Sequence, residues 1–584
     1  MRLPTLTRDD LRAGWLILVA CLSVSMVVAA MAALNTALPD IAVDTGATSA
    51  QMTWIVDGYT LALAALLLPA GAIGDRLGRR GVLIVGLLCF GAASLAAIWV
   101  SDPTQLIVTR ALAGAAAALI MPATLSLITS GVPEDKRALG ISVWAAIAGA
   151  GAIAGFLITG VLLEFFGWHS IFITFAVSSV VAAGLCLTIG TSRDRNPGPF
   201  DVPGSVACVL AVTGVVFGLV EAPQRGWSDP LVLVCLVGGA LLAVAFCLIE
   251  ARRRSPLLDI RLFANRAFAA GSLSVAMQFL ASFGAFFLLL QQLQLVFGYS
   301  PLQSAWALMP FVAGVGVFSL VGNWLAVRFH VLRFVLTVGI ALAGIASVAL
   351  GVTEHESYWG IAWQLGIFAA GIGLATAPST TAIMSNTPLD NQGVGSAVND
   401  TARELGAAIG IAVAGSIMAA GYTARIGPTA EMARDQLTAA GQQRIAAGDT
   451  AGGQAVLDQA ATIAETIRRS LAEAIAVAER LSGQAAPLAE RITEGARDAF
   501  VGPMNQGYIT LGSVLIVSAA VLFWLAPRRV TEPSAEPSAE PAPAESAVET
   551  SAVDASVVDG SAAEASPISE QPLGSHDRRE ERLD

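Results

Sequence analysis

Long apolar runs recur along the chain, and each is long enough to cross a membrane as one helix. A hydrocarbon core of ~30 Å needs about 20 helical residues. Fourteen runs meet this length: 14–34, 53–73, 81–100, 105–129, 139–163, 170–190, 203–221, 230–249, 268–293, 302–327, 332–353, 358–380, 396–420 and 507–526. The first is too long for a signal-peptide core, and no convincing cleavage site follows it. The pattern predicts an all-α integral membrane protein with fourteen transmembrane helices.

The composition agrees with a chain that mostly faces lipid. Hydrophobic residues make up 55% of the 584 residues and charged residues 13%, with a mean hydropathy of +0.69, whereas a soluble domain carries about 25% charged residues. The net charge of -11 reflects acids concentrated in the C-terminal tail, so it says little about the substrate. The six cysteines lie inside apolar runs without ligand-like spacing, which predicts small buried apolar residues and no disulfides or metal sites.

Arginine and lysine lie in alternate loops, which sets the expected orientation because cytoplasmic loops retain positive charge. With fourteen helices counted, the basic loops all fall on one side; they lie around 76–80, 136–137, 193–195, 252–266, 328–333 and 528–529. The other loops carry mainly acids, with Arg225 as an exception. We therefore expect both termini in the cytoplasm.

A long segment, 421–506, separates the last two apolar runs. Its middle has a helical pattern, with apolar residues three, four or seven positions apart at Val456, Ile463, Ile467, Leu471, Ile475, Ala478 and Leu481. Pro487 is expected to break any continuation of this helix. Three interpretations are open: an amphipathic helical hairpin that caps the outer mouth, a docking surface for an envelope partner over 428–500, or lipid contact. The segment 527–584, rich in Glu, Pro, Ala and Ser, is predicted to be a disordered acidic cytoplasmic tail.

An ordered set of glycines and charges follows the second apolar run: Gly71, Gly74, Asp75, Arg76, Gly78, Arg79 and Arg80. Glycine permits a tight turn and close helix approach, Asp75 can face a helix N-terminus, and the arginines can pair with acids or lipid phosphates. This loop resembles the signature loop of the major facilitator superfamily, and such a charged clasp can lock one face of a carrier shut. A weakened copy at 325–329 has Val327 in place of the acid, as parallel repeats predict.

The resemblance covers nearly the whole membrane portion. The stretches 35–39, 54–61, 293–303 and 395–406 are similar to those of the fourteen-helix drug:proton antiporter family. The family implies the major facilitator fold, with two six-helix bundles and two extra helices between them. The parts implied are a first bundle at 1–190, two additional helices within 191–266, and a second bundle at 267–526 that contains the extracytoplasmic insertion 421–506.

Two departures from the family pattern bear on antiport. Gly151, Gly155 and Gly160 in the fifth helix resemble the antiporter motif and predict close helix packing. The family's proline after the central glycine is Phe156 here, which removes an expected kink. In the first helix, Ala30 stands where many relatives carry an acid.

Without a carboxylate at Ala30, Asp57 in the second helix becomes the leading acid for coupling. A carboxyl group in a low-dielectric cavity can alternate between a protonated and a cation-accepting state; the alternative is a hydrated acid at the mouth. By resemblance, Arg110 in the fourth helix takes part in proton coupling, unless it snorkels to the outer boundary. Asp400 and Glu404, four residues apart on one helical face, are a proton site or a structural gate cluster.

An ion gradient is the expected energy source, because the sole lysine, Lys136, is not part of a Gly-Lys-Ser/Thr phosphate loop. We expect a non-enzymatic, proton-coupled exporter of amphipathic cationic drugs in the bacterial inner membrane. The alternatives are an exporter of an envelope lipid or endogenous natural product, and a non-transporting sensor or scaffold. The expected partners are the lipid bilayer, a small amphipathic substrate and protons; we expect a monomer with no cofactor, no metal and no nucleic acid.

Overall fold

The computed structural model describes residues 8–194, 199–353, 355, 357–483 and 485–528. The predicted tail from 529 onward, and Arg195 of a predicted basic loop, lie outside these residues. Every regular element within them is helical. The first part of the chain forms α1 (Arg8–Thr45), α2 (Ser49–Leu77), α3 (Arg79–Ala97), α4 (Pro103–Gly131), α5 (Glu134–Phe165) and α6 (His169–Cys186). Two further helices and a short turn follow: α7 (Val202–Arg225), α8 (Pro230–Arg252) and η1 (Ile260–Ala264).

The second part is longer and holds the remaining helices. They are α9 (Arg266–Gln291), η2 (Gln292–Val296), α10 (Pro301–Ala307), α11 (Met309–Phe329), α12 (Leu332–Val352), α13 (Tyr358–Ser385), η3 (Leu389–Asn391), α14 (Gln392–Ala446), α15 (Thr450–Arg469), α16 (Leu471–Ser482) and α17 (Ala486–Leu525).

The predicted membrane helices are present. Thirteen segments of the described chain are long and apolar enough to span a membrane. The remaining predicted run, 139–163, lies on α5, which has 32 residues and some side chains outside the described set, so only its second part, Ala154–Phe165, counts as a shorter apolar helix. The all-helical membrane fold expected from the apolar pattern is thus confirmed.

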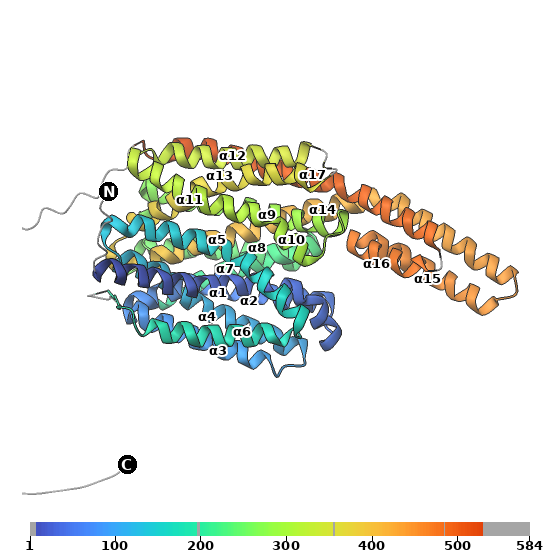
Figure 1. Cartoon of the computed structure of the whole chain (residues 1–584), viewed down its shortest axis with the longest axis horizontal. Helices are drawn as coiled ribbons and strands as arrows, with labels where there is room; N and C mark the ends of the chain where they lie inside the picture. The colour runs from blue at the N-terminus through green and yellow to red at the C-terminus, as the bar shows by residue number, and fades with distance from the viewer. Residues whose placement is uncertain (1–7, 195–198, 354, 356, 484, 529–584) are drawn as a thin grey trace, which may run out of the picture. The chain divides into compact units, whose positions relative to one another are not determined.

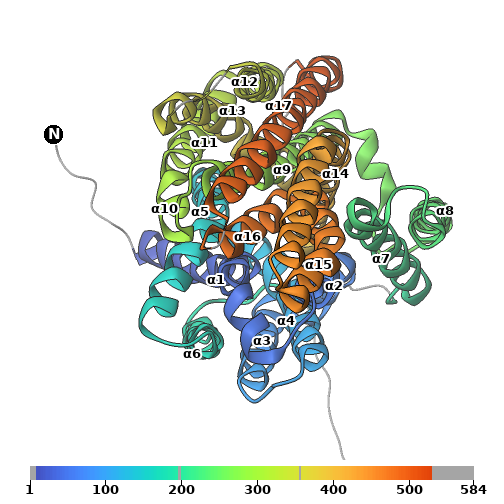
Figure 2. The same cartoon turned by 90° about the vertical axis from the view of Figure 1, so that its right-hand side faces the viewer.

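The helices form two bundles with the same internal contacts. In the first bundle (α1–α6), α1 packs on α5, α2 on α4, and α3 on α4 and α6. In the second bundle (α9–α14 and α17), α9 packs on α14, α11 on α13, and α12 on α13 and α17. The bundles meet where α2 and α4 touch α14 and where α5 touches α11, as Figures 1 and 2 show from two sides. The repeat that the sequence suggested only in one loop is therefore present in whole bundles.

Two ends of the molecule are distinguished by their contacts. At one end, which we call the Asp75 end, Lys136 pairs with Asp10 at the start of α1, and Arg266 donates to the carbonyl of Leu525 at the end of α17. The first and last described helices therefore start and finish at this end. At the opposite end, which we call the stalk end, α14 and α17 project far beyond the bundles, with α15 and α16 beside them (Figure 1).

The projecting stalk corrects one expectation. We expected the membrane helices to stop near Gly421 and resume near 507, with a separate hairpin between them, but α14 continues to Ala446 and α17 already begins at Ala486. Gly421 does not end its helix. It has no side chain, which lets α14 pack closely against Pro503 of α17. Pro487 does not break a helix because it lies in the first turn of α17, where a missing N–H is tolerated.

The apolar pattern read from the insertion is the packing face of the stalk. Ile467, Leu471 and Ala478 are buried, and the hydroxyl of Tyr422 on α14 donates to the Ile467 carbonyl at 3.0 Å. The predicted helical stretch is divided, because Ser470 ends α15 and caps α16. α14, α15, α16 and α17 together bury their own core, so the stalk is a four-helix unit built on two membrane helices.

The six cysteines are all free, but they are not all buried as expected. Cys21, Cys186 and Cys208 are buried, Cys235 is intermediate, and Cys89 and Cys247 are exposed. An apolar helix of a membrane bundle has a face that contacts lipid, so an apolar environment in the sequence does not imply burial inside the protein.

Candidate functional site

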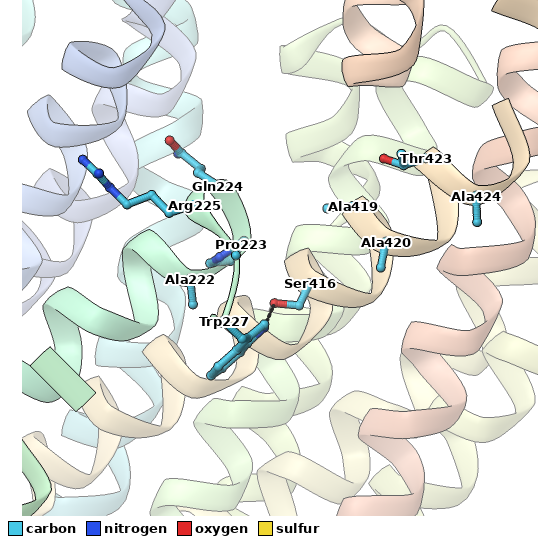
Figure 3. Close-up of a pocket in the computed structure, with 11 residues that line it drawn as sticks. Ala222, Pro223, Gln224, Arg225, Trp227, Ser416, Ala419, Ala420, Thr423 and Ala424 are labelled. Carbon is cyan, nitrogen blue, oxygen red and sulfur yellow. Dashed lines mark hydrogen bonds between the residues drawn. The ribbon is translucent and has the colours of Figure 1, made fainter. Parts of the chain in front are cut away.

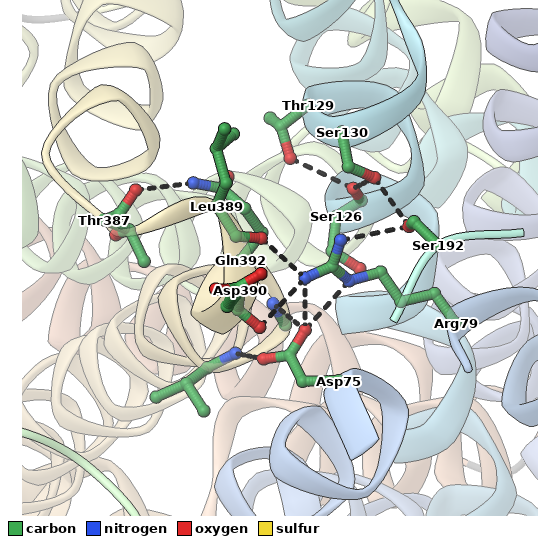
Figure 4. A network of polar contacts seen from close by, with 12 residues as sticks. Asp75, Arg79, Ser126, Thr129, Ser130, Ser192, Thr387, Leu389, Asp390 and Gln392 are labelled. Atoms are coloured by element: carbon green, nitrogen blue, oxygen red, sulfur yellow. Dashed lines mark hydrogen bonds and ion pairs between the residues drawn. The ribbon is translucent and has the colours of Figure 1, made fainter. Parts of the chain in front are cut away.

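At the Asp75 end, a buried ion pair of the first bundle, between Asp75 and Arg79, makes hydrogen bonds to the backbone of the second bundle. Asp75 Oδ1 accepts the N–H of Gly393 at 2.8 Å, and Oδ2 accepts the N–H of Val394 at 3.0 Å, at the first turn of α14. Arg79 donates from Nε to Asp75 Oδ1 at 2.8 Å and from Nη2 to the Leu389 carbonyl at 3.0 Å. Both charged side chains are almost fully buried, and we call this arrangement the clasp (Figure 4).

The clasp is favourable because its charges complement each other and the helix. The N-terminus of α14 offers unpaired N–H groups and a positive dipole end, and a carboxylate satisfies both. Arg79 neutralises that carboxylate and also donates to Ser192 Oγ at 3.0 Å in the α6–α7 connection. At this end, one acid of the first bundle is therefore bound to one helix end of the second.

The other residues of the predicted loop support the clasp in different ways. Gly71 lies so close to Gly393 that a Cβ would be 2.5 Å from the Gly393 carbonyl oxygen, and Gly78 has a φ of 107°, which a side chain would strain. Arg80 donates to the Ile189 carbonyl at 2.9 Å, and Arg76 lies over the Phe200 ring at 5.2 Å. The remaining glycine of the motif, Gly74, has no close neighbour.

The contact between α11 and α5 is the counterpart of the clasp in the second bundle, and the hydrogen bonds that form it involve no charged side chain. Asn323 on α11 donates to Ser142 Oγ at 2.8 Å and to the Ala138 carbonyl at 3.0 Å, both on α5. Arg328, the counterpart of Arg76 in the weakened repeat, is exposed and lies over the Phe329 ring instead. The contact between α11 and α5 therefore depends on an amide, which fits the loss of the acid at Val327.

Charged residues of α14 lie buried between the bundles. Asp400 is fully buried, and its Oδ1 accepts from Asn399 Nδ2 at 3.1 Å. The Arg403 guanidinium is sandwiched between two aromatic rings, Trp144 of the first bundle at 4.7 Å and Phe279 of the second at 5.0 Å. Glu404 is also buried, and Asp400 and Glu404 both act electrostatically on Arg403. Two acids and one base thus share a buried site that both bundles enclose.

Arg110 is buried deep in the first bundle and does not snorkel. Its Nη2 donates to the Ala30 carbonyl at 3.0 Å, its Nε donates to the Ile55 carbonyl at 3.2 Å, and its guanidinium lies 4.4 Å from the Tyr59 ring centroid. The interpretation as an outer-boundary arginine is therefore wrong. The charge is balanced by carbonyl dipoles and a ring, and it points at the backbone of Ala30, where relatives carry the acid.

Asp57 has an acidic neighbour that sequence reasoning missed. Glu221 on α7 is buried and acts electrostatically on Asp57. It accepts from Trp54 Nε1 at 3.1 Å and pairs with Arg225 one turn further along α7. Asp57 itself is half-buried, so it is neither a core residue nor a freely hydrated one. The hydrogen bond between Trp54 and Glu221 joins the additional helix α7 to α2 of the first bundle. The two residues are far apart in the sequence, so no local pattern predicts this contact.

The glycines of the fifth helix serve packing within the first bundle. A Cβ at Gly155 would lie 2.5 Å from the Ala29 carbonyl oxygen, and one at Gly151 would lie 3.0 Å from Val28 Cβ. Both glycines therefore hold α5 against α1. Gly160 instead faces Leu302 of α10 at 3.4 Å, across the bundle interface.

A groove of about 560 Å³ opens at the stalk end between the end of α7 and α14 (Figure 3). Trp227 closes one side and donates from Nε1 to Ser416 Oγ at 2.9 Å. Small residues of α14, including Ala419 and Ala420, line the other side, while Arg225 at the edge pairs with Glu221. The groove is largely apolar, and Arg225 connects its edge to Glu221. In the described part of the chain, no set of three or more His, Cys, Asp or Glu side chains is placed to hold a metal ion.

Comparison with known proteins extends the sequence resemblance. A family model described as Major Facilitator Superfamily matches residues 20–411. The methyl viologen resistance protein SmvA of Salmonella typhimurium is 33% identical over 76% of this chain and 92% of its own. The multidrug efflux pump LfrA of Mycolicibacterium smegmatis is 32% identical over 75% and 87%. The tetracenomycin C resistance and export protein of Streptomyces glaucescens is 30% identical over 87% and 90%.

Proposed function

Because this chain belongs to the Major Facilitator Superfamily, it is a multi-pass membrane transporter and not an enzyme, and we propose that it exports amphipathic, cationic drugs in exchange for protons. The names of its relatives support this, since they include a methyl viologen resistance protein and a multidrug efflux pump. Methyl viologen is itself an organic cation. We infer that the membrane is the cytoplasmic membrane of a bacterium, because these relatives come from bacteria.

The observation that carries the proposal is the pair of buried acids on α14 between the bundles. Burying a charge is costly, and ionisable groups inside a membrane bundle usually serve transport. Asp400 and Glu404 lie where both bundles meet, and Asp57 with Glu221 forms a second acidic site nearer the stalk end. Each carboxylate can hold either a proton or an organic cation, so binding one ligand favours release of the other.

The transport cycle follows from the closed Asp75 end. In this proposal the bundles at 1–190 and 267–526 rock about their interface, with the helices of 191–266 between them. The Asp75 end and both termini face the cytoplasm, so the structure represents the carrier closed towards the cytoplasm. One proton entering down a potential of 100 mV supplies about 2.3 kcal/mol, to which a pH gradient adds.

Proteoliposomes test the coupling directly. Ethidium, a cationic dye, is presented to the purified full-length protein while a trapped pH indicator records proton movement. We expect ethidium transport to move protons the opposite way, and Asp57→Asn and Glu404→Gln each to reduce this exchange by at least about tenfold, the effect of ~1.4 kcal/mol on a barrier. Asp102→Asn is the matched control, because Asp102 only caps α4 at the stalk end. Exchange unchanged in both site variants would refute these roles.

The stalk favours a second candidate, export of an envelope lipid or natural product with handover to a partner at 428–500. The stalk projects beyond both bundles, and one relative is named a tetracenomycin C resistance and export protein. A Cβ at Gly495 would lie 2.4 Å from Thr429 Oγ1, so a deletion of 430–494 closed by a short Gly-Ser loop keeps the base of the stalk. Ethidium efflux that survives this deletion supports drug export, whereas its loss supports handover.

A further inference from the structure

One side of α14 carries polar atoms that no other protein group satisfies. Thirteen buried side-chain polar atoms of the described residues make no hydrogen bond. Five of them belong to one stretch of α14, residues 392–403. They are Gln392 Oε1, Ser396 Oγ, Asp400 Oδ2, Thr401 Oγ1 and Arg403 Nε. All five side chains are more than nine-tenths buried. Leaving such atoms unsatisfied costs about 1–3 kcal/mol each, so this concentration requires an explanation.

The spacing of these residues forms a continuous line. Gln392, Ser396, Asp400 and Glu404 follow one another every four residues, so each lies one turn above the last on neighbouring positions of the helix surface. Their Cβ atoms are about 5–6 Å apart. The structure shows no hydrogen bond between successive side chains of this line, and one water molecule between each pair would satisfy their unpaired atoms. From Gln392 to Glu404 the line covers about 18 Å.

Ser396 is the most informative member of the line. Many buried serines elsewhere in the bundles satisfy their hydroxyls on their own helix, as Ser126 does on the Ala123 carbonyl and Ser379 on the Ala375 carbonyl. Ser396 is fully buried and makes no such bond. Its hydroxyl is therefore free to donate to one water molecule and accept from another.

The two ends of the line reach the two parts of the proposed mechanism. Gln392 directly precedes Gly393, whose N–H donates to Asp75, and its Nε2 donates to the Thr387 carbonyl at 2.6 Å (Figure 4). Asn391, the residue before it, is exposed at the Asp75 end. At the other end, Glu404 lies between the bundles and acts electrostatically on Tyr59.

We propose that this side of α14 binds a single file of water that conducts protons between Glu404 and the Asp75 end, with the clasp as its outlet. The inference rests on the proposed proton coupling. When Glu404 gives up its proton, the O–H bond breaks and the proton passes to the first water, which releases another towards Asp400 and Ser396. One proton enters the file and one leaves beside Gln392 when the clasp opens.

The test compares two substitutions of equal shape. Ser396→Thr and Ser396→Val add the same volume, but only threonine keeps a hydroxyl. In proteoliposomes exchanging ethidium for protons, we expect Ser396→Val to slow proton release by at least about tenfold and Ser396→Thr to retain it. Ethidium affinity, measured by fluorescence, is expected to be equal in both. Ser319→Ala is the matched control, because Ser319 on α11 is also fully buried and unpaired but lies outside the line.

Three outcomes overturn the inference, and they are distinguishable. Equal proton release by the valine and threonine variants removes the water file and leaves the proposed coupling intact. Equal slowing by Ser319→Ala shows that any buried hydroxyl has this effect. Ethidium transport by the unsubstituted protein without proton movement removes the proposed coupling, and the water file with it. Should both larger side chains prevent folding, Ser396→Ala gives the same comparison without added volume, with slowed proton release expected and normal release contradicting the file.

Discussion

Substituting Asp75 with asparagine removes the charge that holds the two bundles together at the Asp75 end. The carboxylate accepts two N–H bonds from the first turn of α14 and two from Arg79. An amide offers one oxygen and one nitrogen, so it keeps one side of this arrangement and places an N–H donor against the other. Hydrogen bonds to charged groups contribute about 1.5–3 kcal/mol each, and the charge at a helix N-terminus adds about 0.3–2 kcal/mol.

The closed state is thus expected to lose about 2–4 kcal/mol relative to the open state, which shifts their ratio by roughly 30-fold to 1000-fold. Spin labels at Leu77 and Leu389, both exposed on opposite sides of the clasp, report the change as a distance distribution. The labels are attached through cysteines in a protein whose reachable native cysteines are serines; these are Cys89, Cys235 and Cys247. We expect one short distance in the parent protein and a major population at longer distance in Asp75→Asn.

The matched control is again Asp102→Asn, since asparagine caps a helix about as well as aspartate and Asp102 lies within one bundle. Its distance distribution should equal that of the parent. The reasoning is refuted if Asp75→Asn keeps the short distance, because the ion pair would then be a result of closure and not its cause.

Three further predictions follow from close packing and from buried charge. Gly114→Ala should lower the thermal stability of the detergent-solubilised protein by several degrees, because its Cβ would collide with the Tyr59 carbonyl, whereas Gly81→Ala has open space and should be neutral or stabilising; equal effects would contradict this. Arg403→Leu should abolish ethidium transport in cells at normal membrane abundance, because two buried acids lose their cation, and retained transport would exclude the role. Ile467→Ala should destabilise the stalk by about 2–5 kcal/mol, seen as faster proteolysis of 421–506 with ethidium efflux intact.

Much of the fold was predictable because membrane helices are signalled locally. A run of apolar residues identifies its own helix without knowledge of any neighbour, and the apolar run at 507–526 lies on α17 as predicted. The extent of α17 was not predictable in this way, because its polar first half at 486–506 is stabilised by packing inside the stalk. The end of an apolar run at Gly421 and the proline at position 487 suggested helix ends. At Gly421, packing against Pro503 of α17 outweighed this local signal, and α14 continues.

In the candidate site too, local sequence patterns identified some residues, whereas contacts between distant segments could not be predicted. The order of glycine and charge identified Asp75 and Arg79 before any contact was known, since the spacing itself carries the information. The partners of Arg403 and Asp57 came from other helices, at Trp144 and Glu221, and no local pattern links them. The unpaired hydroxyl of Ser396 is an even less local property, because it depends on the absence of a bond that many other buried serines make.

The unbroken course of α14 from the clasp to the stalk tip has a mechanical consequence. The part of the helix from Gly421 to Ala446 is an arm of about 38 Å, and a tilt of about 10° at its base moves the far end by about 7 Å. Each transport cycle that tilts α14 would therefore move the stalk tip outside the membrane, and the length of the helix increases this displacement. A fluorophore or a neighbouring envelope protein at the tip could register transport without touching the substrate.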